Sequence, residues 1–579
     1  MKSRKIISIT LALITALFAV MSCIPTALAA EYQANGATYF TFTDGGITVS
    51  EGTYDGYKIE GTSLTINDSG TYVLSGNCAD GSVKVKKGTT GVTLVLNGLT
   101  LTSSTTAPIA CNKSTEVRII VASGSVNTLT DSAKNNDDNY PDNTDAENAV
   151  IKCKDGSQVT LSGSGTLNIT ANGKNGIKSG ATTDEEGEAW MTISDLTLNI
   201  TASVNDAINA EQLLNVTSGN ITISAGDDAI HSDYILNIGS ENGEGPVINI
   251  KSCHEGLEAA TLNVYSGNIT IHASDDCLNA ANSDLSGYAF SINIYGGTLV
   301  MDTTSGDGVD SNGSLTISGG TLVVWSANTA DNQPLDADGT ITISGGTVLA
   351  AGGSNGMGMN ISASQPYVIY GSTSGMGGGM GGNFPGGGRG NGNFPDRSNQ
   401  SGDIPAPPSG GFTGDTNDTK GGFTGGNPYG GFPGNAGSSV SISSGSTIAL
   451  KDSSGNTVYS GEALCSASVL IFSSSALENG ETYTLYVNNT ETGTATASAD
   501  GSGSTGGNSG NQPSGNQSGS NTTSHDQTDS FETDAPDNSS ADSTASSSSD
   551  SNTGLWIAIG VLSVALAVII ILLCKTHKK

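Results

Sequence analysis

The chain has 579 residues, of which 55 are Asp or Glu and 22 are Lys or Arg, so its formal net charge is −33. This balance excludes a nucleic-acid binder, because affinity for phosphate backbones comes from Lys and Arg. The acidity either serves solubility alone or is partly neutralised by bound cations.

Residues 1–30 predict a signal peptide. Lys2, Arg4 and Lys5 precede an apolar run, and the small residues "ALAA" at 27–30 suit cleavage. We therefore expect a secreted protein.

Residues 31–370 repeat internally. An aliphatic landmark recurs every 21 to 31 residues, and "SGNITIS"-like turns precede short alternating strands. Such repeats indicate a solenoid, and their unequal lengths disfavour a propeller. We predict an all-β fold, a right-handed parallel β-helix of about ten coils. The landmarks are Ile151, Ile177, Ile208, Ile230, Leu257, Leu278, Val309 and Leu335.

The chain after the repeats changes character several times. Residues 371–437 are rich in Gly, Pro and Met, and we expect a disordered insertion. Residues 438–496 predict a small antiparallel β unit, whose pieces could complete the far end of the solenoid. A Ser/Gly/Asn-rich stalk is expected over 497–554.

A transmembrane helix is predicted at 555–574, where twenty residues match about 30 Å of hydrocarbon. The basic tail, 575–579, is expected in the cytoplasm. The bulk of the protein would then lie on the extracellular face of the bacterial cell membrane, anchored by one helix.

Acidic residues recur at fixed positions around the landmarks. From Ile177 onward, five of the seven residues that lie two positions before a landmark are acidic. Stacked about 4.8 Å apart, such carboxylates would repel one another unless cations lay between them. The candidate ligands are Asp206, Glu211, Asp227, Asp228, Asp233, Glu255, Glu258, Asp275, Asp276, Asp307, Asp310, Asp336 and Asp338.

Calcium is the predicted ion, because it takes 6 to 8 oxygen ligands and can join neighbouring coils, whereas magnesium prefers to keep its waters. The alternative is that these acids only form Asx turns, which explains "GDG" at 306 better than the double acid of "DDAIHSD". His231, His254 and His272 lie nearby, and we expect them to be solvated or packing residues.

Several motifs carry a resemblance to a known family. "SGTYVLSGN", "NAVIKCKDG", "NDAINAE", "GDDAIHSD" and "GDGVDSNGSLTISGGTL" resemble bacterial extracellular carbohydrate-binding β-helix proteins, similar in fold to family 9 polysaccharide lyases. The resemblance runs from about residue 48 to 353 and resumes in "GETYTLYVNN". It implies calcium-dependent binding of polygalacturonate or pectin, extending to cellulose, without established catalysis.

The expected function is therefore a monomeric cell-surface binder of acidic polysaccharide. A calcium-dependent pectate lyase is the first alternative, since it needs a metal and a basic side chain, for which Lys152 or Lys178 are candidates. A structural surface adhesin is the second. Six aromatic residues could stack on sugar rings, although each could instead pack inside the protein. They are Trp190, Tyr234, Tyr265, Tyr288, Tyr295 and Trp325.

Overall fold

The structure is a computed structural model that describes residues 36–329, 332–354, 359–371 and 440–499. The predicted signal peptide, transmembrane helix and basic tail, and nearly all of the insertion and the stalk, lie outside these residues. The described residues form strands and no helix, and so include none of the length and apolarity needed to cross a bilayer.

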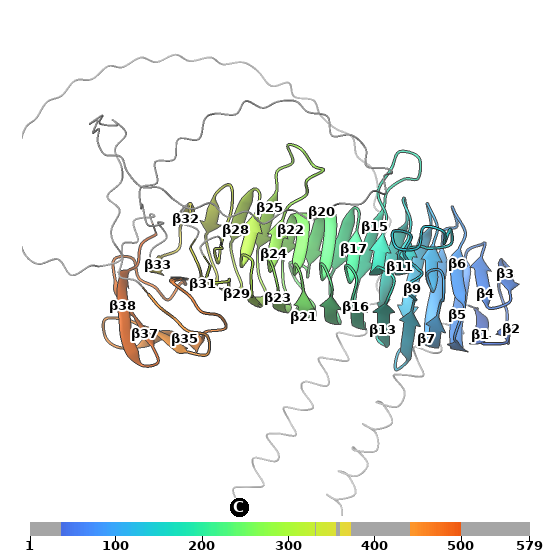
Figure 1. Cartoon of the computed structure of the whole chain (residues 1–579), viewed down its shortest axis with the longest axis horizontal. Helices are drawn as coiled ribbons and strands as arrows, with labels where there is room; N and C mark the ends of the chain where they lie inside the picture. Colours follow the sequence, from blue (N-terminus) through green and yellow to red (C-terminus); the bar gives the residue numbers. More distant parts are fainter. Residues whose placement is uncertain (1–35, 330–331, 355–358, 372–439, 500–579) are drawn as a thin grey trace, which may run out of the picture. The chain divides into compact units, whose positions relative to one another are not determined.

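Successive coils of the chain lie side by side, with their strands paired in parallel in three rows (Figure 1). The first row carries the landmarks and consists of β4 (Ser63–Ile66), β6 (Ser82–Val85), β8 (Ile109–Cys111), β11 (Ala149–Cys153), β14 (Asn175–Ser179), β17 (Ile208–Ala210), β20 (Ile230–Ile238), β22 (Leu257–Val264), β24 (Leu278–Ala280) and β27 (Val309–Ser311).

The strands β20 and β22 continue from the first row into the second. The other strands of the second row are β1 (Thr38–Thr43), β5 (Gly70–Cys78), β7 (Val92–Thr102), β9 (Glu116–Val121), β12 (Gln158–Gly163), β15 (Trp190–Ile193), β18 (Leu213–Val216), β25 (Ser291–Ile294), β28 (Ser314–Ile317), β30 (Ile341–Ile343) and β32 (Ile361–Ala363).

The ends of β5 and β7 continue into the third row. Its other strands are β10 (Val126–Thr130), β13 (Thr166–Ala171), β16 (Thr197–Ala202), β19 (Asn220–Ala225), β21 (Val247–Cys253), β23 (Asn268–Ala273), β26 (Thr298–Thr303), β29 (Thr321–Trp325) and β31 (Thr347–Gly352).

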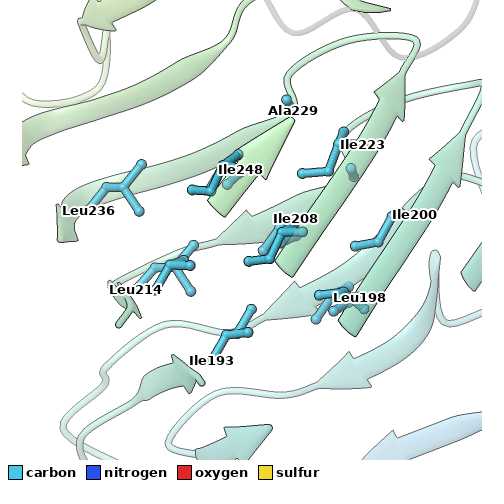
Figure 2. Packing of buried hydrophobic residues seen from close by; sticks show 14 of the residues in the cluster. Ile193, Leu198, Ile200, Ile208, Leu214, Ile223, Ala229, Leu236 and Ile248 are labelled. Carbon is cyan, nitrogen blue, oxygen red and sulfur yellow. The ribbon is translucent and has the colours of Figure 1, made fainter. Parts of the chain in front are cut away.

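Period-two alternation explains why these segments are strands with one buried face. In β13, "TLNITA", Leu167 and Ile169 point inward, and Thr and Asn point outward. The landmarks from Ile151 to Val309 pair in register from coil to coil, as Ile208 does with Ile230. All eight landmarks belong to one continuous apolar core, part of which Figure 2 shows around Ile208. The all-β architecture with parallel strands between coils is confirmed, and its right-handed sense stays a prediction.

A row of asparagines joins four coils on the outer face of the second row. The Nδ2 of Asn237 donates to Oδ1 of Asn215 at 2.9 Å, Asn263 repeats the contact at 2.9 Å, and Asn293 does so at 3.0 Å. Asn237 and Asn263 thus each donate to one neighbour in the row and accept from the other.

Antiparallel strands close both ends of the coil stack. β1 pairs with β2 (Gly46–Val49) and β3 (Tyr57–Glu60) pairs with β4. At the far end, β36 (Val469–Ser473) runs antiparallel to both β31 and β33 (Tyr367–Tyr370).

The remaining strands form a four-stranded antiparallel sheet over a second core that includes Trp325 and Phe472. This sheet consists of β34 (Thr447–Lys451), β35 (Thr457–Glu462), β37 (Thr482–Val487) and β38 (Thr490–Thr496).

Candidate functional site

The acids that precede the landmarks stack coil upon coil. For the landmarks from Ile177 to Val309, the amide of the preceding residue donates to the carbonyl oxygen of one of these residues in the following coil, at 2.9 to 3.2 Å. The donors have small side chains; at Gly256, for example, an added Cβ would lie 2.3 Å from the carbonyl oxygen of Cys277. We call this row the acid column, and it consists of Asn175, Asp206, Asp228, Glu255, Asp276, Asp307 and Gln333.

A second row follows the landmarks by one residue, with its side chains outward, and we call it the face column. Its charge changes along the stack, from two lysines through Asn209 and His231 to acidic residues. The residues in register are Lys152, Lys178, Asn209, His231, Glu258, Asn279 and Asp310.

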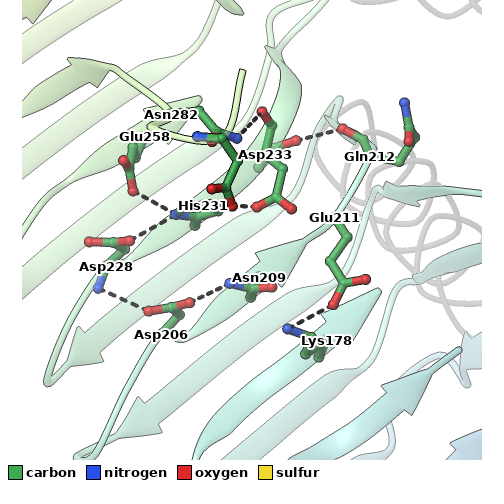
Figure 3. A network of polar contacts seen from close by, with 12 residues as sticks. Lys178, Asp206, Asn209, Glu211, Gln212, Asp228, His231, Asp233, Glu258 and Asn282 are labelled. Atoms are coloured by element: carbon green, nitrogen blue, oxygen red, sulfur yellow. Dashed lines mark hydrogen bonds and ion pairs between the residues drawn. The ribbon is translucent and has the colours of Figure 1, made fainter. Parts of the chain in front are cut away.

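Where the two columns meet, three carboxylates surround His231 (Figure 3). Its Nδ1 lies 3.0 Å from Oδ2 of Asp228 and 2.6 Å from Oε2 of Glu258, and its Nε2 lies 2.9 Å from Oδ1 of Asp233. Burial opposes the protonated ring, but these carboxylates outweigh it and raise the pKa of His231 to about 12. The imidazolium therefore serves as an internal cation.

His231 is not a solvated residue, because its side chain is only 20% exposed and pairs with three carboxylates. His272 is half exposed beside Asp302, and His254 is half exposed at 3.7 Å from Asp275.

Among the residues that the structure describes, two clusters consist of carboxylates alone, with ligand atoms within 4.8 Å of one another. Asp228, Glu255 and Glu258 form one, which we call the Glu258 cluster. The other, the Asp310 cluster, is formed by Asp307, Asp310 and Asp336.

Like charge and burial disfavour ionisation of these acids. Burial, with charge repulsion from Glu258, raises the pKa of Glu255 to about 8 even though Asn279 donates to it. Burial, with repulsion from Asp276, raises the pKa of Asp307 to about 8. Burial and Asp336 raise the pKa of Asp310 to about 6. At neutral pH the clusters are thus poised to exchange protons for a cation.

Amide oxygens beside the acids lack hydrogen-bond partners. Within the part of the chain that the structure describes, Oδ1 of Asn209, Oδ1 of Asn279 and Oε1 of Gln333 are buried and accept no hydrogen bond. Nδ2 of Asn279 lies 2.7 Å from Glu255, and the backbone amide of Gln333 lies 2.5 Å from Asp307. Buried oxygens without donors fit a hard cation, since oxygen is the ligand type of calcium.

The other candidate ligands have different surroundings. Asp206 forms a third group with Asp228 and His231, and burial with repulsion from Asp228 raises its pKa to about 6. Asp276 accepts a bond from the amide of Asp307 at 2.6 Å, and burial raises its pKa to about 7. Burial also raises the pKa of Asp227.

Two more predicted ligands, Asp275 and Asp338, lie at the edges of these groups. Asp275 is grouped with His254 and Glu255, and Asp338 is close enough to raise the pKa of Asp310. Glu211 instead forms an ion pair with Lys178 at 2.9 Å (Figure 3), so the structure does not bring it to an acid cluster.

The two candidate lysines stack on neighbouring coils of the face column. Burial, with the adjacent charge of Lys178, lowers the pKa of Lys152. Of the candidate aromatic residues, Trp325 is fully buried in the second core and cannot stack on a sugar. Tyr265 and Tyr295 stack on each other, with Tyr295 exposed.

Sequence reasoning missed Asn209 and the role of His231. Both occupy the face column, so extending the alignment of acids to every residue that follows a landmark would have found them.

Comparisons with known proteins place this site in a family context. A carbohydrate-binding domain-containing protein of Acetivibrio thermocellus is 34% identical over 124 residues, which cover 21% of this chain and 42% of that protein. The chain thus matches less than half the length of this relative.

A solved structure, of the polysaccharide lyase-like protein from C. thermocellum as a gadolinium derivative, is 22% identical. It covers 56% of this chain and 96% of its own, with a TM-score of 0.30.

A family model matches more than half of the chain. The model describes the carbohydrate-binding domain-containing proteins and matches residues 60–356, which include both columns and all the predicted ligands. The chain therefore belongs to the family of carbohydrate-binding domain-containing proteins.

Proposed function

We propose that this protein binds calcium between its coils and uses these ions to hold acidic plant polysaccharide, polygalacturonate or pectin, at the bacterial cell surface. Cellulose is a second proposed ligand, and the protein would act as a monomer. The observation that carries the proposal is the excess of buried oxygens over hydrogen-bond donors at the Glu258 and Asp310 clusters.

Coulomb energy favours this assignment. Three carboxylates within 4.8 Å repel one another strongly at the low effective dielectric of a partly buried site. A divalent ion reverses this repulsion, and the amide oxygens of Asn279 and Gln333 would add neutral ligands at the two clusters. Calcium at these clusters would supply a fixed positive charge on an otherwise acidic face.

The type of polysaccharide that we propose follows from the charge of the protein. A protein with a net charge of −33 repels an acidic polymer, unless bound cations present open coordination positions to its carboxylates. Lys152 and Lys178 lie in the same column as Glu258 and Asp310, so a polyuronate along this column would meet cations at both ends.

A calcium-dependent pectate lyase is the second candidate. One observation favours it: burial lowers the pKa of Lys152, which increases the fraction of free amine that could act as a base. The ion pair between Lys178 and Glu211 makes Lys178 the weaker candidate of the two.

The test is retention of the full chain on immobilised polygalacturonate, with calcium and with a chelator, while ultraviolet absorbance reports unsaturated products. The proposal predicts calcium-dependent retention without product. Product that disappears in Lys152→Ala would establish the lyase. No retention in either condition would refute polysaccharide binding at these clusters and leave a structural adhesin.

A further inference from the structure

Two tyrosines at one corner of neighbouring coils form a stacked pair. Each is the first residue after its strand: Tyr265 follows β22 and Tyr295 follows β25. Their backbone amides donate to Ile238 and Val264 of the preceding coils at 2.9 and 2.8 Å, so the backbone fixes their alignment. The ring centroids are 5.0 Å apart and the ring planes differ by 13°.

The equivalent positions in the flanking coils carry little or no side chain. In the preceding coil the position is Gly239, at φ 75°, where an added Cβ would lie 2.4 Å from Oγ of Ser266. In the following coil it is Ser318, whose amide donates to Ile294. The aromatic stack therefore ends after two rings.

A hollow of about 450 Å³ lies over this pair, lined by the two tyrosines, Ser318 and Glu241. Its volume is within the range of about 300 to 1,000 Å³ typical of small-ligand sites. Tyr295 is 46% exposed, a large solvent-facing area for an aromatic ring. A carboxylate, a hydroxyl and two aromatic rings thus border one open space.

We propose that this hollow is a subsite for an uncharged chain of β-linked glucopyranose. Such a ring presents axial C–H bonds on its faces, and these bonds carry partial positive charge that the negative face of an aromatic ring attracts. Its hydroxyl groups can donate to the carboxylate of Glu241 and exchange hydrogen bonds with Ser318.

The carboxylate of Glu241 disfavours an acidic sugar at this hollow. Glu241 would repel a uronate, and none of the described residues that line the hollow is a lysine or an arginine. The subsite also lies at a different corner of the coil from the acid column, since the tyrosines follow second-row strands and the acids precede first-row strands. It rests on the proposed carbohydrate-binding role, but not on calcium.

The test is calorimetric titration of the full chain with cellohexaose in the presence of a chelator. Wild type is expected to bind, and Tyr265→Ala and Tyr295→Ala are expected to bind about tenfold or more weakly because each removes a stacking face. Tyr295→Phe keeps the ring and should stay within about twofold of wild type. Tyr140→Ala, an exposed tyrosine in another loop, is the matched control and should bind as wild type does.

Glu241→Gln provides a second test that leaves the tyrosine pair intact, and we expect severalfold weaker binding. No binding of cellohexaose by wild type, or unchanged binding by the tyrosine-to-alanine and Glu241→Gln variants, would overturn the subsite. Retention on polygalacturonate with calcium should persist in Tyr295→Ala, so failure of this subsite is distinguishable from failure of the calcium proposal.

Discussion

His231 shows how one side chain can take the place of a metal ion among stacked acids. It lies between Asp228, Asp233 and Glu258, all within 3.0 Å of its ring nitrogens. Two of these acids, Asp228 and Glu258, also belong to the Glu258 cluster, so the imidazolium and a divalent ion would compensate the same negative charge.

His231→Asn should therefore destabilise the chain chiefly when calcium is absent. Without the imidazolium, buried carboxylates lose their partner, which costs about 3 kcal/mol in the free energy of unfolding. Calcium should recover much of this loss, as measured by denaturant unfolding with the ion and with a chelator. His272→Asn, at a half-exposed pair, is the control and should cost less than about 1 kcal/mol. An equal loss for His231→Asn in both conditions would contradict this role.

Replacing a single cluster carboxylate with the corresponding amide should weaken calcium binding without changing the shape of the side chain. Glu258→Gln and Asp310→Asn each remove one negative ligand charge, and we expect about tenfold lower affinity or one ion fewer by calorimetry. Glu116→Gln changes an outward-facing glutamate of β9 and is the matched control. Unchanged stoichiometry and affinity in both cluster variants would move the ions to other acids.

At the scale of the strand rows, the acid column makes stability depend on pH. The folded-state pKa is about 8 for Glu255 and Asp307 and about 7 for Asp276, all raised by burial. Between the ordinary carboxyl pKa and these values the folded chain binds more protons than the unfolded chain, so stability falls as pH rises. His231 contributes with the same sign above its ordinary pKa.

We expect the melting temperature in chelator to fall by several degrees from pH 5 to pH 8, and calcium to stabilise the chain far more at pH 8 than at pH 5. Thermal unfolding followed by circular dichroism over this pH range measures both effects. A melting temperature that rises with pH in chelator would show that the column is not protonated as proposed.

The alignment of coils could be predicted because a buried face specifies register. One landmark per coil, with alternating strands after it, leaves a single way to stack Ile208 on Ile230 and Leu257, and the acids two residues earlier are then in line. The ion pairs between side chains could not be predicted, because they depend on side-chain rotamers. The pairing of His231 with Glu258 and that of Lys178 with Glu211 are of this kind.

The sequence also contains a signal from which the tyrosine pair could be predicted. Tyr265 and Tyr295 both directly follow a period-two strand, although thirty residues separate them. Aligning the coils on strand ends, rather than on landmarks alone, would have placed the two rings together.

At the scale of the whole molecule, the charge of the chain needs a partner. A net charge of −33 is compatible with solubility, but the acids of the two columns are stacked and partly buried rather than dispersed on the surface. Cations between the coils would convert this acidic face into one that attracts polyuronates, and the tyrosine corner would add a neutral sugar contact.

The most direct measurement is anomalous scattering from a crystal of the full chain grown with calcium. The account predicts anomalous peaks at the Glu258 and Asp310 clusters, with carboxylate oxygens at about 2.3 to 2.6 Å from each ion. Well-ordered carboxylates with no anomalous peak at either cluster would contradict the claim that these coils hold calcium.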